Sequence, residues 1–469
     1  MHSFHSTVSR RDFMKTLGLA SAGIGATAAI SPVFHDMDEV IASPTAGWKR
    51  AWFVKEVDEP TLEIDWNQIH RMDRRGQPGR DVMAGRSDGY YSYYLEIEEF
   101  VKKEFPDWKG TTLRDRALNE AWYSTWMGTQ TVRTPAPTPD QLSGNTSIGP
   151  MPKWQGTPEE NLRTIRAAFR SFGVSSVTVA PVDEKTRKLF YSYVGKQKVT
   201  FEDIDLFEST ADRFAIPNNC QWVIHWTNLQ DTELTSRMPS HVGRAGFPMA
   251  YTHVKRIDLL IEQFLRGLGY QSINAGNYCP SAAFGIMTGV GEHTRMGTTL
   301  NSPEYGSHLR GQYRVVTDLP LAITKPIDAG MERFCETCGV CGTQCPFGAI
   351  AMGDKSWDNA CGQDWASDQS VGGDTCMWNI PGYNGWRLDY RKCMGNCCSC
   401  MGACPFGTAG ASIIHEVVKG TMSVTPVFNS FFRSMSETFN YGHKEPESWW
   451  DLPLEQIPAY GVNPALLVK

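Results

Sequence analysis

The chain has 469 residues, of which 41% are hydrophobic and 20% are charged, a composition that excludes disordered, collagen-like and coiled-coil chains. Its 45 Lys and Arg residues against 51 Asp and Glu residues give a net charge of −6, which argues against a nucleic-acid-binding protein. Most of the 13 cysteines lie between Cys335 and Cys404, and this clustering indicates metal binding rather than a framework of disulfides.

The first residues have the features of an export signal. Arg10 and Arg11 precede Phe13 and Lys15, and a short, weakly apolar stretch follows over residues 17–30. This pattern is typical of a twin-arginine signal, and the stretch is too short to span a membrane. A basic helix cap is the alternative interpretation. We assign residues 1–42 to a twin-arginine signal region and expect export in the folded state, with cleavage after residue 28 or near residue 42.

An aromatic-rich N-terminal region over residues 43–150 leads into a capped helix. Thr157 can cap this helix, Pro158 suits its first position and Glu160 completes a capping box. Apolar residues then recur at helical spacing up to Gly173, which supplies the stop. The pattern predicts a helix over 158–172 and a strand over 174–182.

The alternation of helix and strand continues downstream. Residues 222–226 predict a strand, and apolar residues from Ile257 to Leu268 predict a helix that ends at Gly267 and Gly269. Residues 270–274 predict a further strand. Helices that alternate with short apolar strands indicate a layered α/β core, and we place this domain over residues 151–328.

Two cysteine runs of the ferredoxin type follow, each ending in Cys-Pro. The first run has the spacing x2-x2-x3 and consists of Cys335, Cys338, Cys341 and Cys345. The second has the spacing x3-x2-x3, one residue longer than the usual pattern, and consists of Cys393, Cys397, Cys400 and Cys404. In bacterial ferredoxins the first three cysteines of a run bind one cubane and the fourth binds the other. Zinc is the alternative for Cys-x2-Cys pairs, but two complete runs argue strongly against it.

The crossed pattern assigns the ligands. One 4Fe–4S cluster takes Cys335, Cys338, Cys341 and Cys404, and the other takes Cys345, Cys393, Cys397 and Cys400. Cys398 replaces Cys393 if the extra residue bends the run differently. The segment is too polar to fold around its own core, so we expect a ferredoxin-like domain over residues 329–420 that folds around its metal. Residues 421–469 form a C-terminal aromatic cap.

Three further stretches complete a resemblance to a known family. They are residues 152–161 (PKWQGTPEEN), residues 266–270 (RGLGY) and residues 317–328, which contain TDLPL and KPID. With the signal and the cysteine runs, they resemble the catalytic subunits of corrinoid-dependent respiratory reductive dehalogenases over nearly the whole chain. The resemblance implies an α+β or α/β fold, in which a nitroreductase-like corrinoid-binding domain precedes a ferredoxin-like domain with two 4Fe–4S clusters. The implied reaction replaces a carbon–halogen bond by carbon–hydrogen, consuming two electrons and one proton.

The resemblance also implies a catalytic trio, Tyr251, Asn277 and Arg310. A tyrosine is a poor acid at its ordinary pKa of about 10, but a neighbouring guanidinium favours its phenolate and eases proton release. Arg310 is also expected to stabilise the departing halide, and Asn277 to donate a hydrogen bond to the substrate or to Tyr251. Packing is the alternative role for such a tyrosine, and solvation is the alternative for such an arginine.

The implied corrinoid leaves a weak trace in the sequence. No histidine has an aspartate two residues before it, which fits a base-off corrinoid without a histidine ligand. The glycine-rich stretch over residues 285–297 would let the backbone approach a large flat ligand. Its candidate cofactor-binding residues are Gly289, Gly291, Glu292, Arg295 and Gly297. An ordinary glycine loop is the alternative.

The expected partners follow from the same resemblance. They are a halogenated organic substrate, a small membrane-spanning anchor protein and a membrane respiratory electron donor, with no nucleic acid and a possible homodimer. The expected location is the outer face of the cytoplasmic membrane. Chlorinated ethenes, alkanes and aromatics all stay open as substrates. Two other functions stay open as well: an epoxyqueuosine-reductase-like cobalamin enzyme, and an electron-transfer subunit that carries clusters only.

Overall fold

The computed structural model of the chain describes residues 50–75, 99, 102–103, 153–357, 380–390, 392–393, 395, 397–407, 413–438, 443–454 and 457. All of them belong to one unit of contacts, Arg50–Lys469. The twin-arginine segment and most of the 43–150 region lie outside the described residues. The domain boundaries expected at 150, 328 and 420 stay predictions. Helices and strands are both present, so the expected α/β content is confirmed.

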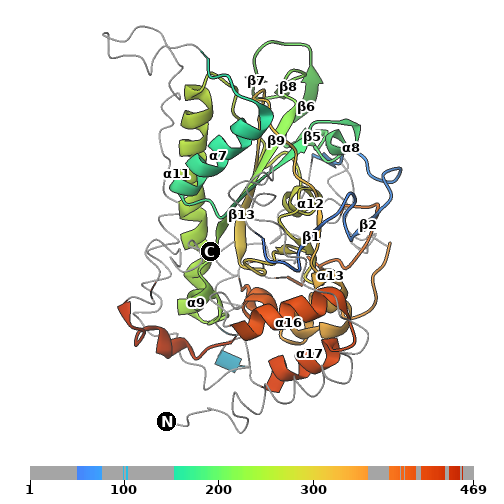
Figure 1. Cartoon of the computed structure of the whole chain (residues 1–469), viewed down its shortest axis with the longest axis vertical. Coiled ribbons are helices and arrows are strands. Elements are labelled where there is room, and N and C mark those ends of the chain that lie inside the picture. Colours follow the sequence, from blue (N-terminus) through green and yellow to red (C-terminus); the bar gives the residue numbers. More distant parts are fainter. Residues whose placement is uncertain are drawn as a thin grey trace. The chain divides into compact units, whose positions relative to one another are not determined.

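A four-stranded antiparallel sheet forms the centre of the unit (Figure 1). Its strand order is β10 (Ile273–Asn274), β13 (Leu309–Thr317), β9 (Trp222–Leu229) and β4 (Ser176–Pro181). The strands predicted over 174–182, 222–226 and 270–274 are therefore all present. The second is longer than predicted, and the third is reduced to two residues.

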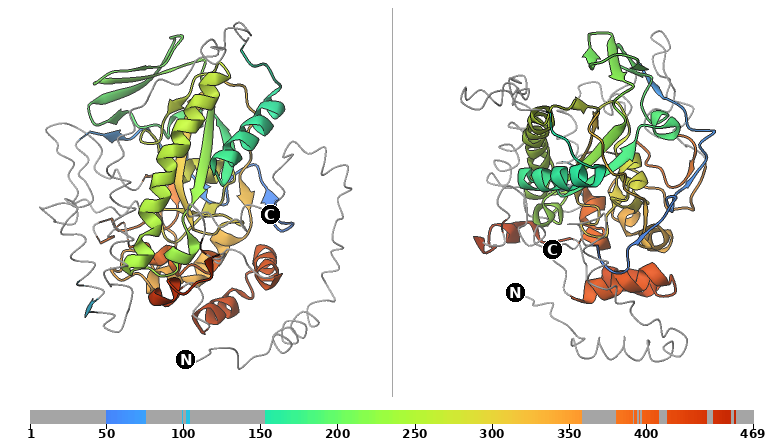
Figure 2. Two further views of the ribbon diagram at one scale, coloured as in Figure 1. Left: turned by 90° about the vertical axis from the view of Figure 1, so that its left-hand side faces the viewer. Right: turned by 45° about the horizontal axis from the view of Figure 1, so that its top comes forward.

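Two helices cover one face of this sheet, α7 (Pro158–Phe172) and α11 (Gly246–Gly267) (Figure 2). The predicted capping box of α7 is present, since the Thr157 hydroxyl accepts from the Glu160 N–H and the Glu160 carboxylate accepts from the Thr157 N–H. Gly173 ends the helix at a φ of 102°. The apolar face of each helix packs on the sheet, as Ile165 and Ile261 do against Trp226.

The opposite face of the sheet packs against α12 (Ser281–Met287) and against a second, mixed sheet. The strands of that sheet, in order, are β3 (Asp73–Arg74), β5 (Tyr193–Val194), β6 (Gln197–Glu202), β8 (Arg213–Pro217) and β7 (Glu208–Ser209). Phe284 of α12, Val316 of β13 and Phe214 of β8 belong to the core between these layers.

The other elements before the cysteine runs are short. They are β1 (Lys55–Glu56), β2 (Glu63–Ile64), α8 (Glu184–Arg187), α9 (Thr232–Thr235), α10 (His241–Arg244), β11 (Glu292–His293), β12 (Leu300–Asn301) and β14 (Ile327–Asp328). Strand β1 pairs with β14, so the segment after Arg50 lies beside the start of the cysteine-rich segment.

The cysteine-rich segment shares its core with the rest of the unit. Its elements are α13 (Met331–Cys338), α14 (Val340–Thr343), β15 (Tyr383–Asn384), α15 (Ser399–Gly402) and the 3-10 turn η1 (Pro405–Gly407). Phe334 and Met401 pack in one cluster with Phe247 of α11 and Met296.

The tail packs back onto this core through α16 (Ile413–Val424), α17 (Asn429–Thr438) and the 3-10 turn η2 (Pro446–Trp449). Phe432 of α17 joins the core of the cysteine-rich segment, and Trp449 packs on Leu234 and Met249. Within the described ranges, no helix combines the length and the apolarity that crossing a membrane requires.

Candidate functional site

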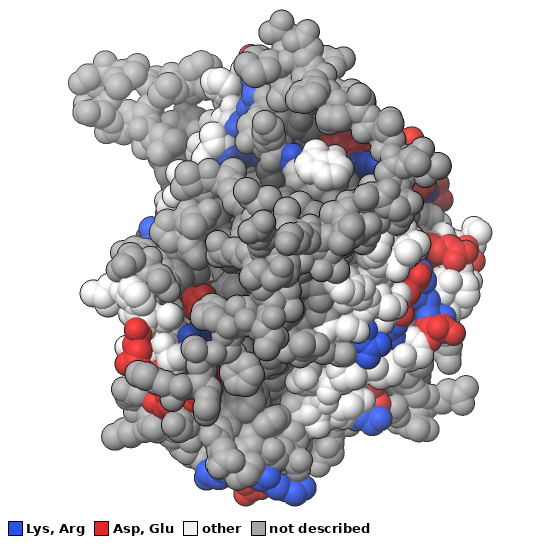
Figure 3. Space-filling view, turned by 60° about the horizontal axis from the view of Figure 1, so that its bottom comes forward, with Lys and Arg blue, Asp and Glu red and all other residues white. Residues whose placement is uncertain are grey.

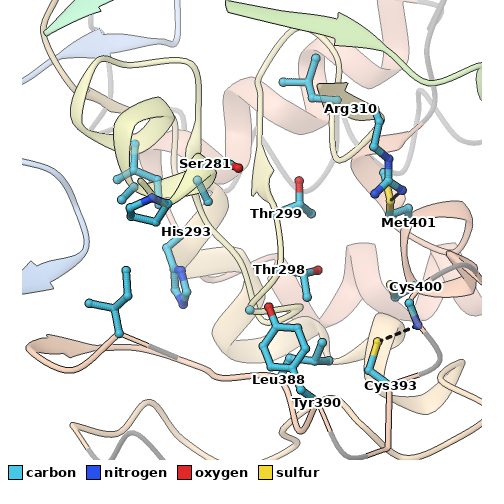
Figure 4. A pocket seen from close by; sticks show the side chains of 18 of the residues that line it. Ser281, His293, Thr298, Thr299, Arg310, Leu388, Tyr390, Cys393, Cys400 and Met401 are labelled. Atoms are coloured by element: carbon cyan, nitrogen blue, oxygen red, sulfur yellow. Dashed lines mark hydrogen bonds between the residues drawn. The ribbon is translucent and has the colours of Figure 1, made fainter. Parts of the chain in front are cut away.

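One large cavity lies between the sheet layers and the cysteine-rich segment. Its volume is about 560 Å³, within the size range of cofactor and small-molecule sites. Figure 4 shows Ser281, His293, Thr298 and Thr299 on its wall, with Arg310 and Met401 across the space. Tyr251, Asn277 and Arg310, which lie far apart in the sequence, all line this cavity, so the fold brings the expected trio together.

The Arg310 side chain is held from two sides by hydrogen bonds. Its Nε donates to Oε1 of Gln230 at 2.8 Å, directly after β9. Its Nη2 donates to Sγ of Cys398 at 3.0 Å and to Sδ of Met401 at 3.2 Å. The guanidinium therefore has one fixed orientation at the cavity wall.

Two aromatic rings of α11 complete the surroundings of Arg310. The guanidinium carbon lies 5.0 Å from the ring centre of Phe247 and 5.8 Å from that of Tyr251. Burial alone would lower the pKa of Arg310, but the neighbouring Cys398 and Tyr251 side chains raise it above its ordinary value. Arg310 thus keeps its charge in a half-buried place, next to the phenol that is the candidate acid.

An irregularity in β13 points two side chains into the same cavity. Arg310 and Tyr313 are three residues apart and would face opposite sides of a regular strand. The register with β9 shifts between them, and both residues line the cavity. The Tyr313 ring stacks on Trp226, with ring centres 5.3 Å apart, and burial followed by the neighbouring Tyr251 raises the pKa of Tyr313. Sequence reasoning missed Tyr313 and Gln230, since a bulge has no pattern that marks it.

The loop that carries Asn277 is fastened to β13. The guanidinium of Arg314, 1% exposed, donates to the carbonyl oxygens of Gly276 and Cys279 on either side of Asn277. A side chain at Gly276 would collide with the Tyr313 ring, since an added Cβ would lie 2.7 Å from it. Asn277 itself is exposed along the cavity edge.

The first predicted cysteine quartet is gathered in one buried pocket. Cys335, Cys338 and Cys341 line it together with Cys404 from the second run, as the crossed pattern requires. Burial raises the pKa of each of these four thiols. Thiols in such a place ionise when they bind metal, so the donor set suits an iron–sulfur cluster.

The second quartet lines the large cavity. Its members are Cys345, Cys393, Cys397 and Cys400. Backbone N–H groups already point at two of these sulfurs: Ala349 donates to Cys345 at 3.4 Å, and Gly395 donates to Cys393 at 3.3 Å (Figure 4). Cys398 lines the same wall, so the choice between Cys393 and Cys398 stays a prediction.

The quartets differ from sites for a single ion. Among the described residues, no group of three or more His, Cys, Asp or Glu side chains is arranged to hold one metal ion. A cubane places four irons between its cysteines, so its ligands are spaced more widely than those of a tetrahedral zinc ion. The donor chemistry of both quartets, four thiols each, fits such clusters.

The glycine-rich stretch lies mostly outside the cavity. Of its five candidate residues, Gly297 lines the cavity wall. A Cβ at Gly289 would collide with the carbonyl of Lys325, and one at Gly291 with that of Asn301, so these glycines permit close packing within the protein. Their role in binding a corrinoid stays a prediction.

The other two candidates of that stretch contact the start of the cysteine-rich segment. The Glu292 carboxylate accepts from the N–H groups of Ala329 and Met331, at 3.0 and 2.9 Å, where α13 begins. The Arg295 guanidinium donates to four backbone carbonyls. One of them belongs to the predicted ligand Cys335, and this hydrogen bond is 2.9 Å long. Both side chains therefore contact the segment that carries the first quartet, whereas the sequence analysis assigned them to the corrinoid.

His293 is a histidine of the cavity wall. Its Nε2 accepts from the Trp386 N–H at 3.2 Å, and its ring stacks on that of Trp386 at 6.0 Å. Burial, followed by the positive charge of Arg387, lowers the pKa of His293 to about 3, so the imidazole is neutral. The Nε2 atom of His293 therefore already has a hydrogen-bond partner within the protein.

The charged surface is mixed where it is described. In Figure 3, Lys and Arg side chains lie next to Asp and Glu side chains on the visible face. Ion pairs such as Lys325 with Asp58 and Arg333 with Asp328 have this character. The expectation that no nucleic acid is bound stays a prediction.

Comparison with known proteins gives a consistent set of similarities. The protein-family model described as "Reductive dehalogenase subunit" matches residues 49–201 and 193–321. A chloroethene reductive dehalogenase of Dehalococcoides mccartyi is 32% identical over 99% of this chain and 100% of its own length. A trichloroethene reductive dehalogenase of another strain of that organism is 30% identical, over 95% of this chain and 97% of its own. The tetrachloroethene reductive dehalogenase of Sulfurospirillum multivorans is 26% identical over 89% of this chain and 79% of its own.

Solved structures show a related fold. The catabolic reductive dehalogenase NpRdhA, in complex with 3-bromo-4-hydroxybenzoic acid, matches with a TM-score of 0.55 and 19% identity over 84% of this chain. A further match with a TM-score of 0.54 is a reductive dehalogenase structure described as suggesting a mechanism for B12-dependent dehalogenation. This chain spans 50% of the length of each of these two structures.

Proposed function

Because this chain belongs to the reductive dehalogenase family, and is therefore an oxidoreductase acting on carbon–halogen bonds, we propose that it dechlorinates chloroethenes with a corrinoid and two 4Fe–4S clusters. The balanced reaction takes an organochloride, two electrons and one proton to the carbon–hydrogen product and chloride. Family membership favours this function over an epoxyqueuosine reductase and over a subunit that only carries electrons.

A single observation carries the proposal: the cavity is lined at once by Tyr251, Asn277 and Arg310 and by the second cysteine quartet. An electron acceptor bound in this space lies next to one cluster and next to a candidate acid. Bound there, a base-off corrinoid would supply the low-valent cobalt that reduces the carbon–halogen bond. The size of the cavity and its wall of small residues, among them Ser281, Ala282 and Thr298, suit a flat cofactor.

Three residues around the cavity supply the proton, stabilise the charges that develop and orient the substrate. Tyr251 donates the proton from its phenol oxygen, and the charged guanidinium of Arg310 stabilises the phenolate that is left. Arg310 also stabilises the developing halide, because a cation that is already fixed in place by hydrogen bonds acts without reorganising. Asn277, at the open edge, orients the substrate by a hydrogen bond.

The surroundings of His293 agree with a base-off corrinoid. Since its Nε2 accepts from the Trp386 N–H and its ring is packed against the Trp386 ring, releasing it toward a metal would break both interactions. The same proposal places the protein on the outer face of the cytoplasmic membrane, exported by the twin-arginine route. A small membrane-spanning anchor protein and a membrane electron donor complete it there, with a homodimer as a further possible assembly.

The test uses the anaerobic holoprotein with an artificial low-potential electron donor. Trichloroethene, a chlorinated alkane and 3-bromo-4-hydroxybenzoic acid are offered separately, and halide release is measured. We expect chloride from trichloroethene, because the chain is 30% or more identical to chloroethene and trichloroethene enzymes over nearly its full length. Release from the bromophenol alone would contradict the chloroethene assignment, and no release from any of them would contradict the proposed function.

Tyr251→Phe tests the candidate acid, since it removes only one oxygen at the cavity wall. We expect turnover to fall at least about 100-fold, which is the lower range for losing a general acid. Both clusters and the corrinoid should stay bound. Unchanged turnover would remove Tyr251 from the mechanism.

A further inference from the structure

Resting on the proposed function, in that the first quartet holds a 4Fe–4S cluster, we propose that Arg295 and Asn301 stabilise the reduced form of that cluster. Both residues line the pocket of Cys335, Cys338, Cys341 and Cys404. Neither belongs to the cysteine runs. Together they would make the first cluster easier to reduce than its cysteines alone would.

Arg295 places a positive charge inside the protein, and among the described residues no carboxylate forms an ion pair with it. The side chain is 4% exposed, and its guanidinium lies 4.6 Å from the ring centre of Trp386. The acceptors of its hydrogen bonds are neutral carbonyl oxygens, those of Cys335, Glu336, Ala351 and Gly353, at 2.8 to 3.0 Å. A buried charge is costly unless an opposite charge compensates it. The thiolates and the cluster in the same pocket supply that negative charge.

The contact with Cys335 makes this arrangement specific to one quartet. Arg295 Nε donates to the carbonyl of Cys335 itself, and its Nη2 to the carbonyl of the next residue, Glu336. The guanidinium is thus held against the part of α13 that carries the first cluster ligand, Cys335. We therefore assign Arg295 to the first cluster rather than to the corrinoid, which was the partner expected from the sequence.

Asn301 brings an amide to the same pocket. Its side chain is fully buried at the end of β12, and its Oδ1 lies 3.8 Å from Sγ of Cys404. Its Nδ2 is buried and has no hydrogen-bond partner among the residues that the structure describes. A half-turn of the amide places Nδ2 at the sulfur, where it would donate to a thiolate. This unsatisfied donor then has an acceptor once Cys404 is a ligand.

Both groups act in the same direction. One-electron reduction adds a negative charge to the cluster, and no bond to a protein atom is made or broken. A nearby cation and an N–H donor to sulfur stabilise the more negative form, so both raise the reduction potential. A raised potential favours the acceptance of electrons by the first cluster.

The test is a potentiometric titration of the anaerobic holoprotein followed by electron paramagnetic resonance, which reads each cluster separately. In Arg295→Gln we expect the ratio of reduced to oxidised first cluster to fall about tenfold at a fixed potential, a shift of about 59 mV for a one-electron couple. Asn301→Leu should shift the same cluster in the same direction by less. The second cluster should stay at its wild-type potential in both variants.

Arg295→Lys keeps the charge and loses most of the carbonyl contacts. We expect its first cluster to stay near the wild-type potential, which separates charge from packing. If the first cluster is lost from Arg295→Gln, the potential of the cluster in Asn301→Leu decides the proposal instead. An unchanged potential in both Arg295→Gln and Asn301→Leu, or equal shifts of both clusters, would overturn it. A wild-type protein without cluster signals would instead contradict the proposed function.

Discussion

Cys398 occupies an unusual place at the residue scale. Its φ of 46° lies in the left-handed region, where side chains other than glycine are strained, and it immediately precedes α15. Its Sγ accepts from Arg310 at 3.0 Å. The strained backbone thus places a sulfur against the candidate catalytic arginine, on the same wall as the second quartet.

This geometry predicts that Cys393 completes the second cluster. Its sulfur accepts from the backbone N–H of Gly395, whereas the Cys398 sulfur lies against the guanidinium of Arg310, on the side of the cavity that holds the candidate catalytic residues. Cys398→Ala should therefore keep about eight irons per chain, as two 4Fe–4S clusters require, and Cys393→Ala should lose the second cluster. Iron analysis and resonance spectra measure both. Cys220→Ala, a change at a buried thiol outside both quartets, is the control. The reverse pattern would make Cys398 the ligand.

Glu292 gives a prediction on pH. Burial, opposed by the N–H groups of Met331 and Ala329, raises the pKa of Glu292 to about 7 from 4.5, with Asp328 and Glu332 adding repulsion. Thr61 donates to this carboxylate, and Arg333 is the cation that it influences. A raised carboxyl pKa contributes stability that is present below about 4.5 and lost as the pH rises through about 7.

Glu292→Gln should remove this pH dependence. Relative to the wild type, the variant should gain stability between pH 5 and pH 8, by on the order of 2 to 3 kcal/mol at most. Thermal unfolding of both proteins at the two pH values measures the difference. A constant difference across this range would show that Glu292 is ionised throughout.

The sequence predicted the chemistry of single residues unevenly. The spacing of the cysteines was enough to predict that Cys404 lies with the first run, because the two cubanes of a ferredoxin take their ligands at fixed spacings. Tyr251 and Arg310 came from resemblance, since no local pattern marks a residue that acts across a cavity. Gly289 and Gly291 show the opposite case. These glycines lack a side chain because carbonyl groups of the protein itself pack closely against them. A sequence does not distinguish this close packing from the close approach of a ligand.

At the scale of elements, α7 is the helix that the sequence specified most completely. Its capping box accounts for two N–H groups at the start, so Thr157→Ala should destabilise the protein by about 1 kcal/mol. Thr164 lies inside the same helix, half-buried, and its hydroxyl donates to the Glu160 carbonyl. Thr164→Ala should therefore be neutral or slightly stabilising. Chemical denaturation of the two variants compares them, and equal losses would show that the cap contributes nothing specific.

Other elements had weaker signals for physical reasons. Helix α11 begins at Gly246, well before the predicted Ile257. The prediction missed these first residues because they are buried all round, Phe247 and Met249 among them, and so do not alternate between an apolar and a polar face. Strand β9 runs on to Leu229 through Thr227 and Asn228, which are buried polar residues. Polar side chains in a covered strand conceal it from a pattern based on hydrophobicity.

At the scale of the whole unit, the cysteine-rich segment and the α/β layers share packing. Cys338, Cys341 and Cys404 belong to the same core as Phe247 of α11 and Met296. The core under α7 and α11 is instead built of aliphatic and aromatic side chains such as Ile165, Ile224 and Val315, and none of its described members is a cysteine. The expectation that the segment lacks a core of its own therefore needs one addition: part of its support comes from α11.

This division predicts how the protein responds to loss of its metal. Removing the clusters leaves thiols without metal in the shared core. Local unfolding of α13 and α15 should therefore become more frequent. The pairing of β9 and β13 near Ile224 and Val315 rests on the metal-free core and should keep its protection.

Hydrogen exchange of the cluster-free and reconstituted proteins measures both regions. We expect amides of α13 and α15 to exchange at least about tenfold faster without clusters, a loss of about 1.4 kcal/mol in local opening, and to recover on reconstitution. Equal acceleration in β9 and β13 would mean that the metal holds the whole unit together rather than one part of it. Unchanged exchange in α13 would mean that packing against Phe247 and Met296 is sufficient by itself.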